Sequence, residues 1–263
     1  MRSVLSIAGS DSSGGAGIQA DIKTIEACGL FAQTAVCALT AQNTLGVNGV
    51  LDVPATFVAQ QIDAVFSDIR PDAVKVGMLS SPEVVEVVAS SIERWGPIPL
   101  VVDPVMISTS GASLISSEAF EALCADLLPL ATLITPNIPE AEALLGAGIA
   151  TELSQERAAQ QLARRFDCAV LVKGGHGLND ANDVLALPLG GARWLRAPRI
   201  DNPNTHGTGC TLSSAIACGL AEGRTIAAAV REAKDYLSGA LSAGLDLGKG
   251  SGPLMHFWQH AQR

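Results

Sequence analysis

The stretch Asn202-Pro-Asn-Thr-His-Gly-Thr-Gly-Cys-Thr-Leu-Ser-Ser-Ala215 joins a polar turn directly to the start of a small-residue, apolar helix. Gly207 and Gly209 allow the backbone to come close to a bound group. The free N–H groups and the positive dipole end of the following helix point to the same place. Because phosphate-sized anions bind at such helix starts, the stretch predicts an anion site. The alternative is an ordinary glycine-containing turn before a packed helix.

Cys210 lies at the start of this predicted helix, where a thiol is expected to be acidified towards thiolate. A phosphate cradle that contains a potential base suggests phosphoryl transfer. The alternative is that Cys210 is a small hydrophobic residue of the core. The stretch alone leaves both interpretations open.

The composition of the chain excludes several classes of protein. With 48% hydrophobic and 16% charged residues among 263, the chain is neither disordered nor fibrous. Its net charge of −9 argues against nucleic acid or an anionic membrane as partner. The first apolar run is too short for a signal peptide, and no run approaches the roughly 18 residues of a membrane helix. Six cysteines without a Cys-x-x-Cys pair fit a reducing cytosol, so we expect a cytoplasmic protein.

Short aliphatic runs alternate with helical patterns along the chain, which predicts an α/β fold with a doubly wound, mostly parallel sheet. We expect residues 1–263 to form a single domain, because no linker or repeat interrupts the pattern. The last two strands lie close in sequence and should pair as an antiparallel edge. The predicted strands are 3–8, 34–40, 73–78, 100–102, 133–134, 169–172, 183–187 and 193–199. The predicted helices are 18–28, 53–67, 82–95, 117–128, one from about 140, 154–166 with Ser154 as N-cap, 208–221, 225–243 and 254–262.

Ligands of such sheets bind outside the carboxyl ends of the strands. Nearly every polar residue suited to chemistry follows a predicted strand, and this coincidence predicts one active site. The residues at these ends are Gly9-Ser-Asp11, Gln42-Asn43, Gly77-Met78, Asp103, Asn137 and Lys173, followed by the stretch from Asn202.

Three of these positions suit a phosphate and its metal ion. Lys173 precedes Gly174-Gly175, and a flexible cation beside approachable backbone suits phosphate. Asp103 and Glu140 offer the hard carboxylate oxygens that hold Mg²⁺, and Asn137 adds a neutral oxygen. The alternatives are a solvated lysine at a strand end and an acidic residue favoured in the first turn of a helix.

Two further positions suit a flat ring. Gln42 can donate and accept at once, as required by a heteroaromatic ring with an amino group next to a ring nitrogen. Met78 offers a polarisable wall for such a ring. Either residue taken alone could be structural.

The glycine-rich loop of residues 11–17 resembles two nucleotide-binding motifs but matches neither in full. It is not a Walker A loop, because Gly15 stands where that motif needs lysine. Residues 15–20 match the loose Gly-x-Gly-x-x-Ala pattern of dinucleotide-binding proteins. The acidic residue expected after the next strand is missing, however, which argues against a nicotinamide-dependent dehydrogenase.

Seven motifs follow one another along the chain, and their shared order is far more specific than any one of them. They are Ala8-Gly-Ser-Asp-Ser-Ser-Gly-Gly-Ala-Gly-Ile-Gln-Ala-Asp21, Ala38-Leu-Thr-Ala-Gln-Asn-Thr44, Lys75-Val-Gly-Met78, Val102-Asp-Pro-Val105, Thr135-Pro-Asn-Ile-Pro-Glu140, Val172-Lys-Gly-Gly-His176 and Asn204-Thr-His-Gly-Thr-Gly-Cys210. Over its whole length the chain resembles the hydroxymethylpyrimidine/phosphomethylpyrimidine kinases of thiamine biosynthesis, within the ribokinase-like superfamily.

The resemblance implies a three-layer α/β/α sandwich that uses ATP and Mg²⁺ as its cofactors. It implies phosphorylation of 4-amino-5-hydroxymethyl-2-methylpyrimidine and then of its monophosphate. The implied catalytic residues are Cys210, Gly207, Gly209 and Lys173. The implied substrate contacts are Gln42, Met78, Val105, Asp21 and Gly9; those to ATP are Lys173, Thr205, Thr208 and Asn137; those to the metal are Asp103 and Glu140.

Cys210 occupies the position at which the wider superfamily carries a catalytic aspartate, which distinguishes the chain from sugar kinases. The resemblance also implies a homodimer, and no second domain for a later thiamine phosphate coupling step is expected. Two alternatives remain open at this point. One is a pyridoxal/pyridoxine kinase, alone or in addition, and the other is a non-catalytic pyrimidine-binding protein.

Overall fold

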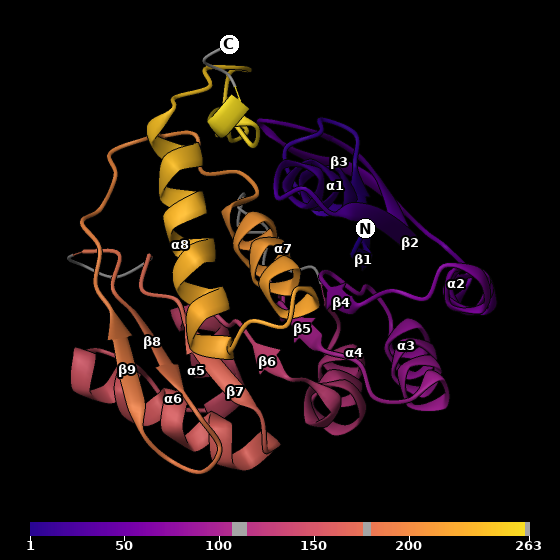
Figure 1. Ribbon diagram of the computed structural model, residues 1–263, viewed down its shortest axis with the longest axis horizontal. Helices are drawn as coiled ribbons and strands as arrows, with labels where there is room; N and C mark the ends of the chain where they lie inside the picture. Colours follow the sequence, from indigo (N-terminus) through magenta and orange to yellow (C-terminus); the bar gives the residue numbers. More distant parts are fainter. Residues whose placement is uncertain (107–114, 176–179, 261–263) are drawn as a thin grey trace.

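The computed structural model describes residues 1–106, 115–175 and 180–260 of the chain. Within those residues a single sheet of nine strands has the order β3-β2-β1-β4-β5-β6-β7-β8-β9 (Figure 1). The predicted loop at 108–113 and the predicted motif residue His176 lie outside the described residues.

The central strands of the sheet are parallel, and the pairs at its two edges are antiparallel. The predicted antiparallel edge, β8 with β9, is confirmed. The strands are β1 Ser3–Asp11, β2 Phe31–Asn43, β3 Gly46–Asp52, β4 Ala73–Val76, β5 Leu100–Val102, β6 Leu133–Ile134, β7 Ala169–Val172, β8 Asp183–Ala186 and β9 Ala192–Leu195.

Helices cover both faces of the sheet, so the predicted three-layer α/β/α sandwich is confirmed (Figure 1). One hydrophobic core lies between the sheet and α2 to α6, and the other lies between the sheet and α1, α7 and α8. The helices are α1 Gly17–Ala27, α2 Ala55–Asp68, α3 Pro82–Trp95, α4 Ser117–Ala122, α5 Ile138–Leu145, α6 Glu152–Phe166, α7 Thr208–Ala221 and α8 Ile226–Ser242.

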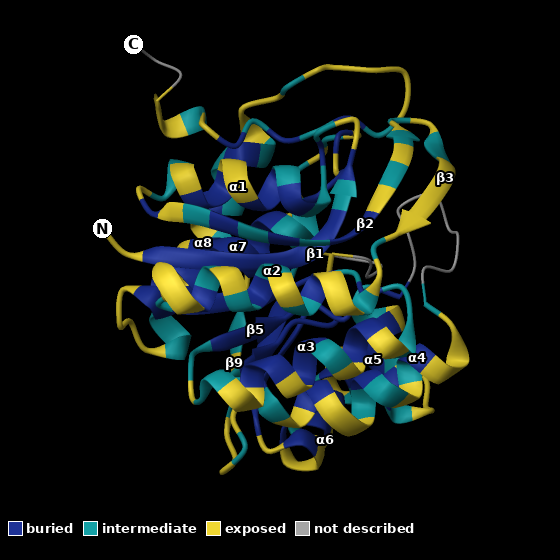
Figure 2. Cartoon of the chain, turned by 90° about the vertical axis from the view of Figure 1, so that its right-hand side faces the viewer, coloured by how far each residue is buried: buried dark blue, intermediate teal, exposed yellow. Residues whose placement is uncertain are grey.

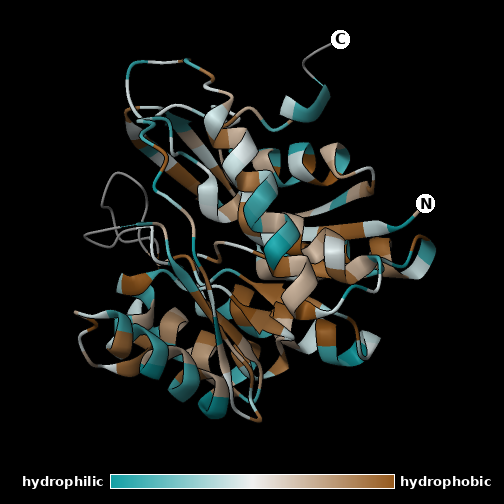
Figure 3. Ribbon diagram, turned by 60° about the vertical axis from the view of Figure 1, so that its left-hand side comes forward, coloured by the Kyte–Doolittle hydropathy of each residue, from teal (hydrophilic) through white to brown (hydrophobic). Residues whose placement is uncertain are grey.

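Burial explains why these segments form these elements. The short strands β4 to β7 are buried on both faces, which is why they read as aliphatic runs without alternation; Figure 2 shows this for β5. Helix α7 is buried along almost its whole length, because it packs between the sheet and α8. The hydrophobic residues therefore concentrate in the middle of the molecule, and hydrophilic ones lie on the outer faces of the helices (Figure 3).

Three predictions about individual elements were wrong, each because tertiary contacts decide the local structure. The strand predicted at 34–40 continues to Asn43, because its end pairs with β3, a strand that was not predicted. The N-cap of α6 is Thr151, whose side chain and that of Ser154 cap each other's backbone N–H groups. Of the helix predicted at 254–262, the described residues form only the 3₁₀ turn Trp258–His260.

Candidate active site

A cavity of about 780 Å³ lies at the carboxyl ends of the strands, where the loops after β1, β5 and β7 meet the start of α7. All predicted site residues except one line this cavity. They are Gly9, Gln42, Met78, Asp103, Val105, Asn137, Glu140, Lys173, Thr205, Gly207, Thr208, Gly209 and Cys210. Residues separated by up to about 200 positions in the chain are thus brought to one place, as strand-end chemistry requires.

The exception is Asp21, which was predicted as a substrate contact. Its side chain is fully buried and does not line the cavity. It accepts hydrogen bonds from Lys75 Nζ at 2.8 and 3.0 Å, and from the hydroxyls of Ser6 and Ser214. Because these partners come from β1, β4 and α7, Asp21 joins three elements behind the wall of the cavity. The structure therefore corrects the predicted contact: Asp21 makes an internal ion pair.

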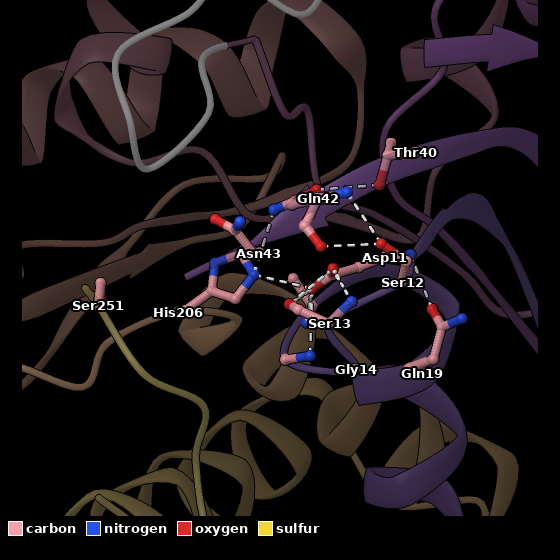
Figure 4. Close-up of polar contacts among 12 residues, drawn as sticks. Asp11, Ser12, Ser13, Gly14, Gln19, Thr40, Gln42, Asn43, His206 and Ser251 are labelled. Carbon is pink, nitrogen blue, oxygen red and sulfur yellow. Dashed lines mark hydrogen bonds and ion pairs between the residues drawn. The ribbon is translucent and has the colours of Figure 1, made fainter. Parts of the chain in front are cut away.

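The loop after β1 folds around the carboxylate of Asp11 (Figure 4). Asp11 accepts hydrogen bonds from the backbone N–H groups of Ser13, Gly15 and Ala16, and from the hydroxyl of Ser13. His206 Nε2 lies 2.8 Å from the same carboxylate. Burial alone would raise the pKa of Asp11, but these hydrogen bonds outweigh it and hold the pKa well below its ordinary value. Asp11 is therefore an ionised, fully bonded centre of the loop.

The amide of Gln42 lies between Thr40 and His206 (Figure 4). Its ends are 3.1 Å from Thr40 Oγ1 and 3.3 Å from His206 Nε2. Its backbone is tied to Ser12, which donates to the Gln42 carbonyl and accepts from the Gln42 N–H. A register shift between Ala41 and Gln42 in the pairing with β3 changes the direction of this part of the strand. The predicted ring-reading residue is therefore held from several sides.

Two glycines bring the loop after β1 into contact with the loop that precedes α7. Gly207 has φ of 86°, and a Cβ added to it would lie 2.0 Å from the carbonyl oxygen of Gly15. A Cβ on Gly15 would lie 2.5 Å from the ring of His206. Neither position accepts a side chain without moving the other loop, so the contact between the two loops requires glycine at both.

The start of α7 has the features of an anion cradle. Gly207 is the N-cap and has no capping side chain; the Thr208 N–H donates to the Thr205 carbonyl at 3.3 Å, and Gly209 and Cys210, next in the first turn, line the cavity. A Cβ on Gly209 would lie 2.9 Å from Asp103 Oδ2 and 3.5 Å from Lys173 Nζ. Glycine at 209 therefore lets the helix start approach the charged groups directly.

The prediction that the helix start acidifies the Cys210 thiol was wrong. Burial raises the pKa of Cys210 to about 11, and the nearby charge of Lys75 offsets only part of this effect. Asp21 and Asp103 raise the pKa further, while a hydrogen bond from the backbone N–H of Gly17 lowers it. Desolvation therefore outweighs the helix dipole, and the free protein carries a neutral thiol at pH 7.

Opposite the helix start, Lys173 and two carboxylates form a charged cluster. Lys173 Nζ donates to Asp103 Oδ1 at 2.7 Å, and the hydroxyl of Thr135 donates to the same oxygen at 2.9 Å. Burial alone would lower the pKa of Lys173, but Asp103 and Glu140 outweigh it and raise the pKa. The ammonium group therefore stays charged at neutral pH.

Glu140 and Asn137 form a capping box at the start of α5. Asn137 N–H donates to Glu140 Oε2 at 2.7 Å, and Glu140 N–H donates to Asn137 Oδ1 at 2.9 Å. Burial raises the pKa of Glu140 to about 7; the charge of Lys173 opposes this shift, and the charge of Asp103 adds to it. The cluster thus has two carboxylates and one ammonium group, which is paired with Asp103, so the cluster carries surplus negative charge above neutral pH.

This donor set fits magnesium better than zinc or another soft metal. The described residues contain no group of three or more His, Cys, Asp and Glu side chains that could hold a metal by themselves. Magnesium is commonly held by one or two carboxylates together with substrate phosphates, and its preferred ligand is oxygen. Asp103 and Glu140 can provide that pair.

Sequence reasoning placed Asp11 at a strand end and His206 in the stretch from Asn202, but it gave neither a role and missed their pairing, which joins positions that no local pattern relates. It also missed other residues of the cavity. Lys234 on α8 donates to the carbonyl of Ala181 and forms an ion pair with Asp183. The neighbouring wall of the cavity is apolar and comes from the loop before the anion stretch and from α8, at Ile200, Leu237 and Leu241. Only their helical spacing marks the α8 residues in sequence, and that spacing is equally typical of core.

A comparison with protein-family models matches residues 11–255 to "Phosphomethylpyrimidine kinase". The hydroxymethylpyrimidine/phosphomethylpyrimidine kinase of Streptomyces coelicolor is 48% identical over 97% of this chain and 94% of its own length. The thiamine biosynthesis bifunctional protein ThiED of Geobacter sulfurreducens is 50% identical over 97% of this chain. The present chain spans about half (52%) of that bifunctional relative.

Among solved structures, the pyridoxal kinase of Bacillus subtilis in its ADP complex superposes with a TM-score of 0.91. It is 33% identical in sequence, and the match covers 100% of both chains. No helix in the described part of the chain is both long and apolar enough to cross a membrane.

Proposed function

The chain belongs to the phosphomethylpyrimidine kinase family, and from this premise we propose that it is a hydroxymethylpyrimidine/phosphomethylpyrimidine kinase of thiamine biosynthesis. It transfers the terminal phosphoryl group of ATP to the hydroxymethyl oxygen of 4-amino-5-hydroxymethyl-2-methylpyrimidine, and then phosphorylates the monophosphate. The observation that supports this proposal is that Gln42 lines the same cavity as Cys210 and the glycines at the start of α7.

The ring binds on the side of the cavity formed by the loop after β1. Gln42 pairs with the amino group and the adjacent ring nitrogen, because an amide can accept and donate at once. Met78 and Val105 flank the ring plane, and Gly9 lies close to Met78, since a Cβ on Gly9 would be 2.8 Å from Met78 Cε. This arrangement leaves the hydroxymethyl group directed at the start of α7.

The phosphates of ATP bind between the start of α7 and the charged cluster. The backbone N–H groups around Gly207 and Gly209 and the ammonium group of Lys173 stabilise negative charge as the phosphoryl group moves. Thr205, Thr208 and Asn137 also line the cavity, and we assign them to the nucleotide. Asp103 and Glu140 would hold magnesium, which would supply charge neutralisation on the phosphates.

Cys210 orients the attacking hydroxyl group. A largely dissociative transition state requires little proton removal until late, so a neutral thiol can hold the hydroxyl first and, at the end, accept its proton while passing its own S–H proton to an oxygen of the transferred phosphoryl group. Cys210 therefore acts through position more than through thiolate character in the free enzyme.

A substrate panel with ATP and Mg²⁺ tests the proposal. We expect ADP release and a phosphorylated product with the pyrimidine alcohol, and again with its monophosphate. If the protein phosphorylates pyridoxal but neither pyrimidine, the proposal is wrong.

A second candidate is pyridoxal kinase activity, alone or in addition. It is favoured by the superposition with the Bacillus subtilis pyridoxal kinase over the full length of both chains. Pyridoxal also carries a hydroxymethyl group on a six-membered ring, so the same panel decides between the two activities and their combination.

We also propose that residues 1–263 form one kinase domain and that the protein acts in the cytoplasm as a homodimer. Exposed apolar side chains on β2, the turn after it and β3 support self-association, namely Leu39, Leu45, Val50 and Leu51. Sedimentation of the purified protein tests the dimer, and Leu51→Glu should weaken it.

A further inference from the structure

The orientation of the Gln42 amide is determined by the residues that hydrogen-bond to it within the protein. The two ends of an amide have the same shape and differ only in hydrogen bonding, so the partners determine which end faces which group. Here the partners are Thr40 on one side and His206 on the other, at 3.1 and 3.3 Å.

On the His206 side of the amide, Asp11 determines which ring nitrogen of His206 carries the hydrogen. An ionised carboxylate only accepts, and Asp11 already receives three backbone N–H groups and a hydroxyl. His206 Nε2, which is 2.8 Å from Asp11 Oδ2, must therefore carry a hydrogen, whether the ring is neutral or protonated. Such an N–H favours an oxygen of Gln42 as its neighbour and disfavours the amide nitrogen.

On the Thr40 side of the amide, Ser10 determines whether the Thr40 hydroxyl donates to Gln42 or accepts from it. Thr40 Oγ1 lies 2.9 Å from the backbone carbonyl of Ser10 and 3.1 Å from the Gln42 amide, and its single hydrogen can serve only one of them. The carbonyl of Ser10 is the closer of the two and can only accept, so it takes the hydrogen. Thr40 Oγ1 then has only lone pairs left for Gln42, so it favours the amide nitrogen as its neighbour. Two independent partners therefore require the same orientation, with Gln42 Nε2 at Thr40 and Gln42 Oε1 at His206.

We propose that His206 is a specificity-determining positioning residue, which together with Thr40 holds the Gln42 amide with its oxygen at His206 and its nitrogen at Thr40. This orientation is a half-turn of the amide from that drawn in Figure 4, and it leaves the heavy-atom positions nearly unchanged. One Gln42 lone pair and one N–H remain for the ligand. They match a ring that presents an amino hydrogen beside a ring nitrogen acceptor, so the inference rests on the proposed function.

The polarity of this arrangement is tested with a ring of the opposite pattern. The 4-oxo analogue, 5-hydroxymethyl-2-methylpyrimidin-4(3H)-one, presents a carbonyl oxygen and a ring N–H where the substrate presents an amino group and a ring nitrogen. An amide held in this orientation binds the analogue weakly, because both of its hydrogen bonds to the ring would set donor against donor or acceptor against acceptor. We expect the wild-type protein to favour the amino ring by at least about a hundredfold in Kd and in kcat/KM.

In the double variant His206→Phe/Thr40→Val the amide is free to turn, and we expect the preference to fall by about tenfold or more. The single variant His206→Phe should lie between the two. The variant His206→Gln keeps an N–H donor at similar reach and should keep most of the preference. A purely structural role would weaken the binding of both rings alike and leave their ratio unchanged.

His256→Phe is the matched control. His256 is also buried and bonds to Thr211 Oγ1 at 3.0 Å, but it does not line the cavity. It should leave the ratio unchanged. The Kd values are measured by calorimetry on variants that melt cooperatively.

The possible outcomes separate this inference from the proposed function. If the wild-type protein phosphorylates the amino ring and the double variant keeps its preference within about twofold, the orientation inference is overturned alone. If the wild-type protein neither binds nor phosphorylates the amino ring, both the inference and the proposed function are overturned. A preference that collapses in the double variant and survives in His206→Gln supports the inference.

Discussion

Two regions of the cavity contain buried carboxylates at strand ends, but the surroundings shift the carboxylate pKa in opposite directions. In the loop after β1, Asp11 is surrounded by neutral N–H and O–H donors of its own loop, together with His206. In the charged cluster, Lys173 forms an ion pair with Asp103, and Glu140 interacts with the same ammonium group through its charge alone. The pKa of Asp11 lies well below its ordinary value, whereas the pKa of Glu140 rises to about 7.

The comparison shows what decides the charge of a buried carboxylate. Desolvation opposes ionisation at both sites, so the difference comes from the number of donors and the sign of neighbouring charges. A carboxylate that has enough fixed donors stabilises a loop by itself. Two carboxylates that lie near a single cation favour the binding of another cation. The loop after β1 is therefore suited to orienting a neutral ring, and the charged cluster to holding phosphate and magnesium.

The largest effect is expected from removing the positive charge of the cluster. Lys173→Ala should reduce kcat by a factor of about 10³–10⁵, as for other single cations that neutralise charge in phosphoryl transfer. The Kd for the pyrimidine ring should stay unchanged, because Gln42 and its partners lie in the other region. Steady-state kinetics and calorimetry measure the two quantities, with the exposed Lys249→Ala as control. An equal loss of ring affinity would show that the two regions are not separate.

Cys210 lies between the two regions, and its removal should have the next largest effect. Cys210→Ala should leave ring binding intact and reduce kcat by a factor of about 10²–10⁴, the usual contribution of a group that handles a proton. An unchanged kcat would remove Cys210 from the reaction.

The raised pKa of Cys210 is checked separately in the free enzyme. With a pKa of about 11, alkylation of Cys210 by iodoacetamide should be slow at pH 7 and should accelerate about tenfold per pH unit up to pH 9. Peptide mass spectrometry distinguishes it from Cys28 and Cys124, which are also partly exposed. Fast alkylation at pH 7 would show that the helix dipole outweighs burial after all.

Much of the fold could be predicted from the sequence, because buried parallel strands and amphipathic helices leave strong local patterns. The ranges 82–95, 100–102, 133–134, 169–172 and 208–221 agree with the structure at both ends. Strand β3 could not be predicted, since its residues are half-buried or exposed and gain their structure only by pairing with β2.

The site residues at strand ends could be placed for the same reason, since their positions follow from the order of strand, loop and helix. What the sequence did not reveal were pairings across long separations. The bond between Asp11 and His206 and the burial of Asp21 against Lys75 depend on how the loops fold together. The Cys210 prediction was wrong because a helix start is visible in sequence and desolvation is not.

In the loop after β1, Asp11→Asn should destabilise the fold by about 1.5–3 kcal/mol, the range for hydrogen bonds to a charged group. The pKa of Asp11 is lower in the folded than in the unfolded chain, so its stabilising effect is present above about pH 4 and is lost as pH falls. The difference between variant and wild type in urea unfolding should therefore shrink from pH 7 to pH 3. A difference that does not depend on pH would show that the charge of Asp11 contributes nothing.

The smallest effect is expected from Glu140→Gln, which should stabilise the fold, whereas Asp11→Asn should destabilise it. Glutamine keeps the capping box with Asn137 but cannot ionise. The folded pKa of Glu140, about 7, lies above the ordinary value of 4.5, so its contribution to stability is fully present below about pH 4.5 and is lost as pH rises through about 7. In the presence of a chelator, the variant should therefore gain stability over the wild type between pH 5 and pH 8.

The gain should appear as an increase in Tm of about 2–4 °C for each kcal/mol, and magnesium with nucleotide should reverse it. The reversal follows because only the ionised carboxylate binds the cation, so the wild-type protein recovers through binding what it loses through burial of an ionised carboxylate beside Asp103. If Glu140→Gln instead lowers Tm equally at both pH values, Glu140 resembles Asp11 and the contrast between the two regions disappears. If the gain appears and magnesium with nucleotide does not reverse it, the surplus charge is real but the cation is held elsewhere.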